Sequence, residues 1–170
     1  MSNIWVKNIV RFLLVMAFQL FVLNEVELHG FINPYLFIVI ILLLPLNISR
    51  AGLILASFVV GLTIDAYSNM LGMHAAACTF LGFVRPYILR FTQPRNGYED
   101  IVEPNDSQLN LSWFLLYAAV GISLHHIVYF FIEAGNFNMP LLTLTRIGAN
   151  IIISLMLVTI YRMLFVVKKS

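Results

Sequence analysis

Apolar residues occur along the chain in six runs, which polar, proline or glycine residues separate. The runs cover about residues 8–24, 33–46, 52–67, 73–91, 112–133 and 140–166. Long apolar runs are typical of helices in hydrocarbon, where about 20 residues are needed to cross a bilayer. The pattern therefore predicts an all-α protein, a polytopic membrane bundle of six transmembrane helices that forms a single integral membrane domain over residues 1–170.

The second run, residues 33–46, differs from the others. It is short, it begins at Asn33-Pro34, and Pro45 interrupts it near its end. Proline removes a backbone donor and ends helices. We expect this run to form either a tilted short span or a re-entrant segment.

Composition supports a membrane location. The chain has 170 residues, of which 61% are hydrophobic and 11% charged, whereas soluble domains have about 45–50% apolar and about 25% charged residues. A chain of this length cannot hide the excess in a core. The net charge of +2 gives no argument for nucleic acid, and the single cysteine, Cys78, excludes an internal disulfide.

The first run is predicted to be a retained span and not a signal peptide. Its apolar stretch is long, and no small-residue cleavage site precedes the acidic sequence Asn24-Glu25-Val26-Glu27.

Basic residues indicate the orientation of the bundle, because lysine and arginine collect at cytoplasmic ends of spans. Six spans with an inner N-terminus make both termini cytoplasmic. Nine of the ten lysines and arginines then lie at or near inner ends of spans: Lys7, Arg11, Arg50, Arg85, Arg90, Arg95, Arg162, Lys168 and Lys169. Arg146 alone falls on the outer half. The polar connection at residues 92–111 faces the cytoplasm, where we expect a solvated linker, with a docking site for a partner as the alternative.

Residues 61–75, GLTIDAYSNMLGMHA, contain the most informative polar position. Asp65 lies near the end of an apolar run, and an acid at that depth is a functional-site hypothesis because it is costly in hydrocarbon. Ser57, Gly61 and Asp65 share one helix face, and Gly52 and Ala56 form a second small pair that permits close helix packing.

Arg146 is the expected partner of Asp65, since both lie at similar depth towards the outer side. It begins a polar row with Asn150 and Ser154 down one face of the last helix. A structural ion pair, a ligand-binding role and simple interfacial exposure are the three open alternatives for Asp65.

No other group of residues predicts catalysis or metal binding. His126 and Glu133 share a face but lie two turns apart, so we favour satisfied or interfacial histidines for His125 and His126 over a metal site. The sequence has no Gly-rich phosphate loop, no nucleophile elbow and no second acid beside Asp65. We expect no catalytic residue, no metal and no cofactor.

The arrangement Gly61-x-x-x-Asp65, followed by Gly72-Met73-His74-Ala75 and a small-residue helix, resembles the bacterial rod shape-determining protein MreD family. The hydropathy agrees over the whole chain, and the specific similarity covers about residues 52–91. The loop at residues 92–111 is longer and more acidic than is typical of the family, which leaves the role of this loop open.

This resemblance implies a non-enzymatic scaffold in the bacterial inner (cytoplasmic) membrane. Its partners would be an MreC-type bitopic protein and, directly or indirectly, MreB-type filaments and the cell-wall synthase pair of a RodA-type glycosyltransferase and a penicillin-binding transpeptidase. The family also looks similar in architecture to the substrate-binding subunits of energy-coupling-factor transporters. Six residues would serve packing or partner binding: Gly61, Asp65, Gly72, His74, Arg146 and Asn150.

Two other functions remain open from the sequence. One is a substrate-binding membrane subunit of a small-molecule (vitamin) transporter, in which Asp65, Arg146, Asn150 and His126 would contact the ligand. The other is an intramembrane enzyme, which would need a second catalytic group beside Asp65.

Overall fold

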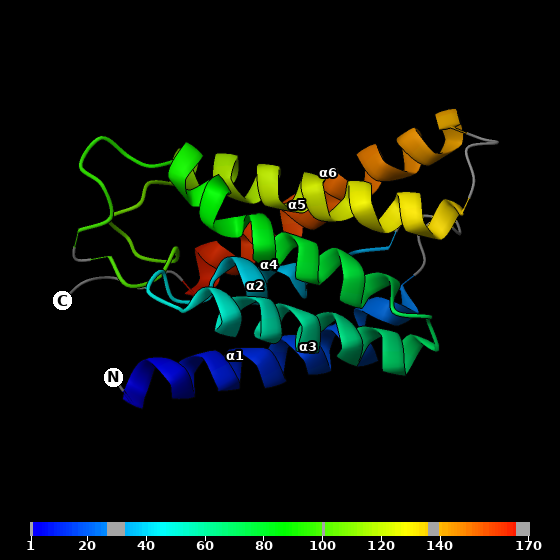
Figure 1. Ribbon diagram of the computed structural model, residues 1–170, viewed down its shortest axis with the longest axis horizontal. Helices are drawn as coiled ribbons and strands as arrows, with labels where there is room; N and C mark the ends of the chain where they lie inside the picture. Colours follow the sequence, from blue (N-terminus) through cyan, green and yellow to red (C-terminus); the bar gives the residue numbers. More distant parts are fainter. Residues whose placement is uncertain (1, 27–32, 100, 136–139, 166–170) are drawn as a thin grey trace.

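The computed structural model describes residues 2–26, 33–99, 101–135 and 140–165, and these residues are helical or irregular, with no strand (Figure 1). Six α-helices and one 3-10 turn follow one another: α1 (Ser2–Phe21), η1 (Leu23–Glu25), α2 (Ile38–Leu42), α3 (Arg50–Ser68), α4 (Met73–Phe91), α5 (Leu111–Ala134) and α6 (Pro140–Phe165). The prediction of an all-α fold is confirmed for this part of the chain.

Within the described residues, four stretches of helix are long and apolar enough to cross a membrane. They are Ile4–Glu25, Arg50–Ser68, Leu111–Ala134 and Leu141–Phe165. The helix α4 has 19 residues, as α3 does, but His74, Arg85 and Arg90 lower its mean hydropathy. His74 and Arg85 are buried inside the protein, so two of these three polar groups of α4 face its neighbours, whereas Arg90 is exposed.

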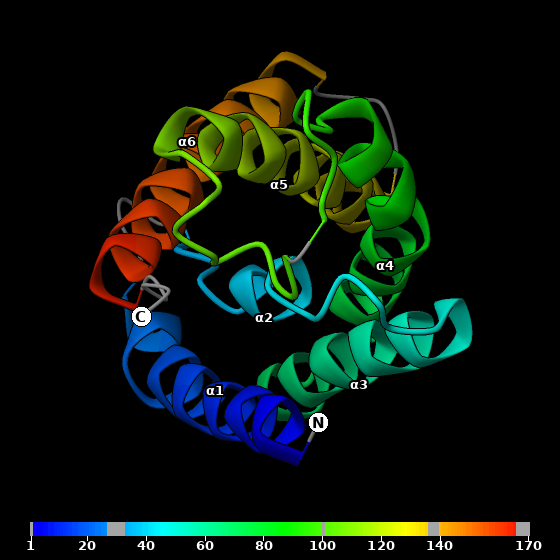
Figure 2. The ribbon, with the colours of Figure 1, turned by 90° about the vertical axis from the view of Figure 1, so that its left-hand side faces the viewer.

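The five long helices surround the short helix α2 (Figure 2). In this ring α3 packs against α4, α4 against α5 and α5 against α6, whereas α1, which η1 continues, contacts the other helices mainly through α2. Every residue of α2 is buried. The centre of the protein is therefore a small helix with protein on all sides.

The second apolar run does not form a spanning helix. Only the 5 residues of α2 are α-helical, which gives a rise of about 7.5 Å at ~1.5 Å per residue, far less than the ~30 Å hydrocarbon core. Pro34 and Pro45 limit the helix on its two sides, because neither can donate a backbone hydrogen bond. Stretches of irregular chain lead from α2 towards opposite ends of the bundle (Figure 1).

The free N–H groups before α2 are bound by side chains from other helices. The Gln19 Oε1 atom accepts from the backbone nitrogens of Leu36 and Phe37 at 2.8 and 3.2 Å. Ser154 Oγ accepts from Tyr35 N at 3.2 Å, and Asn150 Oδ1 accepts from the backbone nitrogen at position 33 at 2.7 Å. Phe37 is the N-cap residue of α2, and the other three donors belong to the irregular chain before the helix, which has no ladder of its own to bind them.

The free carbonyl groups after α2, those of residues 42–44, are bound in the same way. Arg11 donates to the carbonyl of residue 43 at 2.9 Å, and the Tyr117 hydroxyl donates to that of residue 42 at 2.8 Å. Arg85 donates to the carbonyls of residues 42 and 44, and its Nε donates to the Tyr117 hydroxyl at 2.9 Å. Side chains thus replace the hydrogen bonds that a longer helix would make to itself.

The loop between α4 and α5 is anchored to the basic end of the bundle over part of its length. Residues 103–105 and Leu109 are buried, whereas Gln93, Arg95 and Glu99 are exposed as a solvated linker would be. Glu103 is buried and accepts from Lys7 at 2.6 Å and from Arg11 at 2.7 Å. The backbone of the loop accepts from Leu46 N and from Arg162. A buried acid between two cations fixes this loop, whereas hydropathy showed only that the segment is polar.

The Arg85 contacts give a testable prediction about stability. Arg85→Met leaves the buried carbonyl of residue 44 without its donor, while the carbonyl of residue 42 keeps only the bond from Tyr117. An unsatisfied buried group costs about 1–3 kcal/mol. We expect the variant to unfold several degrees lower in thermal unfolding of the detergent-purified protein. The control is Arg90→Met, because Arg90 lies on the same helix and is exposed. Equal unfolding temperatures of the two variants would contradict this role for Arg85.

Candidate functional site

Asp65, near the end of α3, caps the start of α4. Its carboxylate is buried, and it accepts from the backbone nitrogen of His74 at 3.1 Å and from that of Ala75 at 2.8 Å. The first N–H groups of a helix lack intrahelical partners and favour a negative charge. The residue at the N-cap position of α4, Gly72, has no side chain that could do this. An acid from the preceding helix therefore takes the role of the missing cap.

The main chain of Asp65 also ends α3. Its carbonyl accepts from the backbone nitrogens of Asn69 and Met70, the latter at 3.0 Å. Asn69 is left-handed with φ 52°, and Gly72 has φ 81°, a conformation that favours glycine. The turn from α3 to α4 is thus built around one residue, with its carbonyl on one helix and its carboxylate on the next.

Gly61 lies where α3 touches the first turn of α4. A Cβ atom at this position would lie 2.4 Å from His74 O and 2.6 Å from Ala75 N. Further along the same contact, a Cβ at Gly82 would lie 2.4 Å from Ser57 Oγ. The predicted small face of α3 therefore packs against α4, and the close approach at Gly61 brings the amides of α4 within reach of Asp65.

Gly52 and Ala56, the second small pair, do not join this contact. The nearest atom to a Cβ at Gly52 is the Oγ atom of Ser49, the N-cap residue of α3, at 3.0 Å. Both residues line an apolar groove of about 370 Å³ beside α1.

His74 is held by the same carboxylate. Its Nδ1 atom lies 3.0 Å from Asp65 Oδ1, and its Nε2 atom is buried without a hydrogen-bond partner. The ring packs beside two tyrosines, with centroid distances of 5.4 Å to Tyr35 and 4.4 Å to Tyr129. Sequence placed His74 in the motif without indicating that it touches Asp65.

Arg146 pairs with Glu133 of α5 and not with Asp65, so the predicted ion pair is wrong. The Arg146 and Glu133 side chains approach to 3.0 Å, and each is about one quarter exposed. The physical reason is the order of helices in the ring: α6 packs on α5, while the carboxylate of Asp65 is hydrogen-bonded by the start of α4. Asn150 and Ser154 share a face with Arg146, as predicted, but bind the segment before α2.

The two adjacent histidines of α5 are buried. His126 contacts Ile122 O through Nδ1 at 2.8 Å and Ser154 Oγ through Nε2 at 3.3 Å. His125 Nε2 lies 3.6 Å from the Cys78 sulfur. No set of three or more metal-ligating side chains converges within the described part of the chain.

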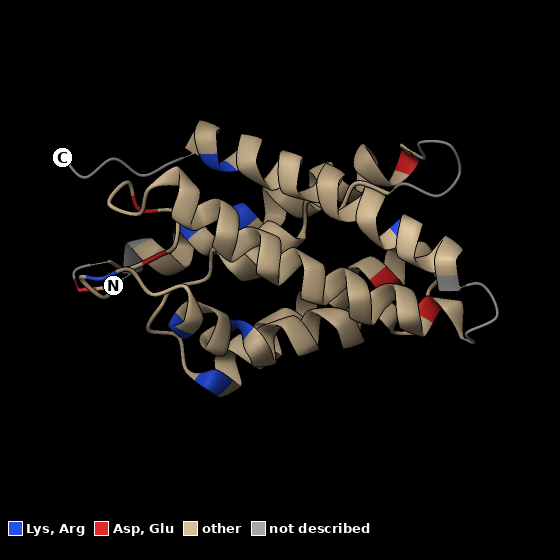
Figure 3. Ribbon diagram, turned by 90° about the horizontal axis from the view of Figure 1, so that it is seen from above, with Lys and Arg blue, Asp and Glu red and all other residues tan. Residues whose placement is uncertain are grey.

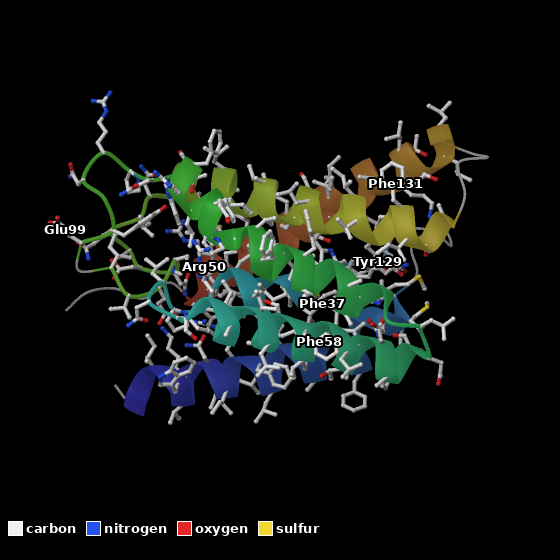
Figure 4. The ribbon with its side chains drawn as sticks, in the orientation of Figure 1. Phe37, Arg50, Phe58, Glu99, Tyr129 and Phe131 are labelled. Carbon is white, nitrogen blue, oxygen red and sulfur yellow. The ribbon has the colours of Figure 1, made fainter. Side chains whose placement is uncertain are left out.

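A polar pocket of about 400 Å³ opens at the end of the bundle where α3 meets α4 and α5 meets α6. Tyr129, seen in Figure 4 on α5 near this end, is one of its lining residues. The others that matter for its chemistry are Glu25, Tyr35, Tyr67, His74, Glu133 and Arg146. Of the residues predicted for a site, His74 and Arg146 thus meet in one pocket, whereas Gly61, Asp65 and Asn150 support the surrounding helices.

Several structurally important residues were missed from the sequence. Gln19 is a polar residue inside the first apolar run, and Arg85 is a cation inside the fourth, so depth alone could have marked both as needing partners. Tyr35, Tyr117 and Tyr129 gave no such signal, because tyrosine is common at membrane interfaces.

Comparison with known proteins identifies no family for this chain. The chain matches no protein-family model, and neither the curated proteins nor the solved structures give a significant match.

The Gly61 contact gives a second testable prediction. Gly61→Ala places a methyl group against the backbone of α4 and forces α3 and α4 apart, which costs about 1–3 kcal/mol. Gly148→Ala on α6 is the matched control, since a Cβ there meets no atom within 4 Å. The control should be neutral or gain up to about 1 kcal/mol from helix propensity. Thermal unfolding in detergent measures both, and a Gly61→Ala protein as stable as Gly148→Ala would refute the contact.

Proposed function

We propose that this chain is a non-enzymatic scaffold of the cell-wall elongation machinery in the bacterial inner membrane. It would maintain rod shape by binding an MreC-type partner and linking it to peptidoglycan synthesis. The observation that carries this proposal is the use of Asp65, whose carboxylate caps α4. The segment that resembles the MreD family is therefore a helix junction, as a scaffold requires, and its acid is already engaged.

The other buried polar groups support the same proposal. Gln19, Arg85 and Asn150 bind backbone groups around α2. Such bonds fix helix positions, and they leave the reaction steps of wall synthesis to partners. In this proposal the glycosyltransferase and transpeptidase carry the chemistry, and this chain sets their placement in the membrane.

The distribution of charge supports a defined orientation. Most of the described lysine and arginine residues lie towards the end of the bundle where α1 begins and α6 ends (Figure 3). Glu25 and Glu133 line the pocket at the opposite end together with Arg146, and Asp65 lies beside that pocket near the end of α3. We propose that the basic end is cytoplasmic, so that both termini and the loop at residues 92–110 face MreB-type filaments. The chain would then cross six times, with residues 33–49 crossing as irregular chain around α2.

The helix α1 is the best candidate contact for a single-span partner. Among the helices it contacts mainly α2, and its outward side chains Ile9, Leu13 and Leu14 are exposed. An apolar helix face at the edge of a membrane bundle suits either lipid or another helix. We propose the span of the MreC-type protein as its neighbour.

Depletion and capture test the scaffold function together. Depleting the protein from rod-shaped cells should make them round, and the tagged protein should copurify with a single-span coiled-coil protein. Normal shape after complete depletion, with no such protein captured, would count decisively against the proposal.

Asp65→Asn separates a scaffold from an enzyme. The amide loses the charge and one acceptor, so we expect about 1–3 kcal/mol lower stability. Loss of shape complementation should follow loss of folded protein and of partner capture. A variant that folds and captures its partner at normal levels yet fails to complement would instead indicate chemistry at Asp65.

A second candidate is the substrate-binding membrane subunit of a small-molecule transporter. The polar pocket of about 400 Å³ favours it, because the pocket has a volume suited to a small ligand. Specific retention of a vitamin by the purified protein would support this function in place of the scaffold.

A further inference from the structure

The polar pocket at the acidic end contains a buried group that the packing of the helices does not use. His74 is 3% exposed and lines the pocket. Its Nδ1 is bound to Asp65, and its Nε2 has no partner among the described residues. Buried polar atoms without partners are rare in folded proteins and point to a missing bond.

The Asp65 contact determines what His74 can bind. A carboxylate can only accept, so Nδ1 carries the proton that lies between the two side chains. In the neutral ring Nε2 then has a free lone pair, which accepts a hydrogen bond. The position beside Nε2 therefore calls for an N–H or O–H donor.

The charges that face the pocket favour a cation. Two acids, Glu25 and Glu133, and one base, Arg146, line it. Arg146 is neutralised by Glu133 at 3.0 Å, whereas Glu25 makes no ion pair with any residue that the structure describes. Asp65 adds a further negative charge directly behind His74. The pocket thus carries an excess of negative charge.

The aromatic walls of the pocket also favour a cation. Three tyrosines, Tyr35, Tyr67 and Tyr129, line it. Aromatic faces attract cations through the ring quadrupole, and the attraction grows when the cation leaves water. We propose that this pocket binds an ammonium or guanidinium group, which donates to His74 Nε2 and is balanced by Glu25.

Two sources can supply such a group: a free small organic cation, or a lysine or arginine side chain of an extracytoplasmic partner segment. The chemistry of recognition is the same in both. Binding by the purified protein does not depend on the scaffold function, so either inference can fail alone.

The probe is agmatine, which carries both an ammonium and a guanidinium group. Its affinity for the purified protein in a maltoside detergent is measured by calorimetry, with acetate as the anionic control. The key variant is His74→Asn, because the asparagine amide can still donate to Asp65 while Nε2 is removed. We expect at least tenfold weaker agmatine binding, the effect of losing a hydrogen bond to a charged group.

A second variant tests the same site by a substitution at an exposed residue. Glu25→Gln, at an exposed position, should weaken agmatine binding several-fold, and Glu99→Gln should leave it unchanged. Glu99 lies in the loop at the opposite end of the molecule from Tyr129 (Figure 4). Agmatine and acetate binding equally, no agmatine binding at millimolar concentration, or equal affinity in wild type and His74→Asn would each overturn the proposal.

The source is distinguished on the same preparation. Native mass spectrometry of the protein from cells would show a small-cation adduct that His74→Asn lacks if the ligand is free. If the ligand is a partner side chain, agmatine would instead elute a copurified protein from the wild type. Either result supports the site and assigns its occupant.

Discussion

The structure depends on one constraint: the backbone of a five-residue helix in an apolar interior must be hydrogen-bonded by other elements. Unsatisfied backbone groups cost several kcal/mol in hydrocarbon, and α2 is too short to satisfy its own. Gln19 of α1 and Ser154 of α6 bind its leading amides, while Arg85 of α4 and Tyr117 of α5 bind its trailing carbonyls. Four helices are thereby tied to the same short segment, and α1 in particular is held to the bundle through it.

At the junction between α3 and α4, a side chain likewise binds backbone groups that a helix end leaves without partners. Gly61 permits close approach, and Asp65 then reaches the free amides of α4. Neither residue is sufficient alone. Asp65 reaches the amides of α4 only because Gly61 lets the two helices approach closely, and the start of α4 needs the carboxylate of Asp65 as its cap. This coupling explains why the two residues are spaced by one helical turn, and it gives the most distinctive segment of the sequence a structural purpose. The cap also orients His74, which links the junction to the polar pocket.

Hydropathy predicted the long helices well, because each is a continuous apolar run, and helical spacing correctly placed Ser57, Gly61 and Asp65 on one packed face. It could not predict partners. Depth along the bundle matched Arg146 to Asp65, but which charges meet depends on the order of helices in the ring, and α5 brings Glu133 to Arg146 instead. The anchor of the loop after α4 was missed for a similar reason. Its Glu103 is buried by cations that are more than 90 residues away in the sequence.

The most direct test of the central constraint is hydrogen exchange of the α2 segment in lipid nanodiscs, followed by mass spectrometry of a peptide covering residues 35–44. The amides of this segment should exchange as slowly as those of α5, and Gln19→Leu should accelerate exchange there while leaving α5 protected. Exchange of residues 35–44 within seconds in the wild-type protein, or unchanged protection in Gln19→Leu, would show that the side chains around α2 do not hold it in place.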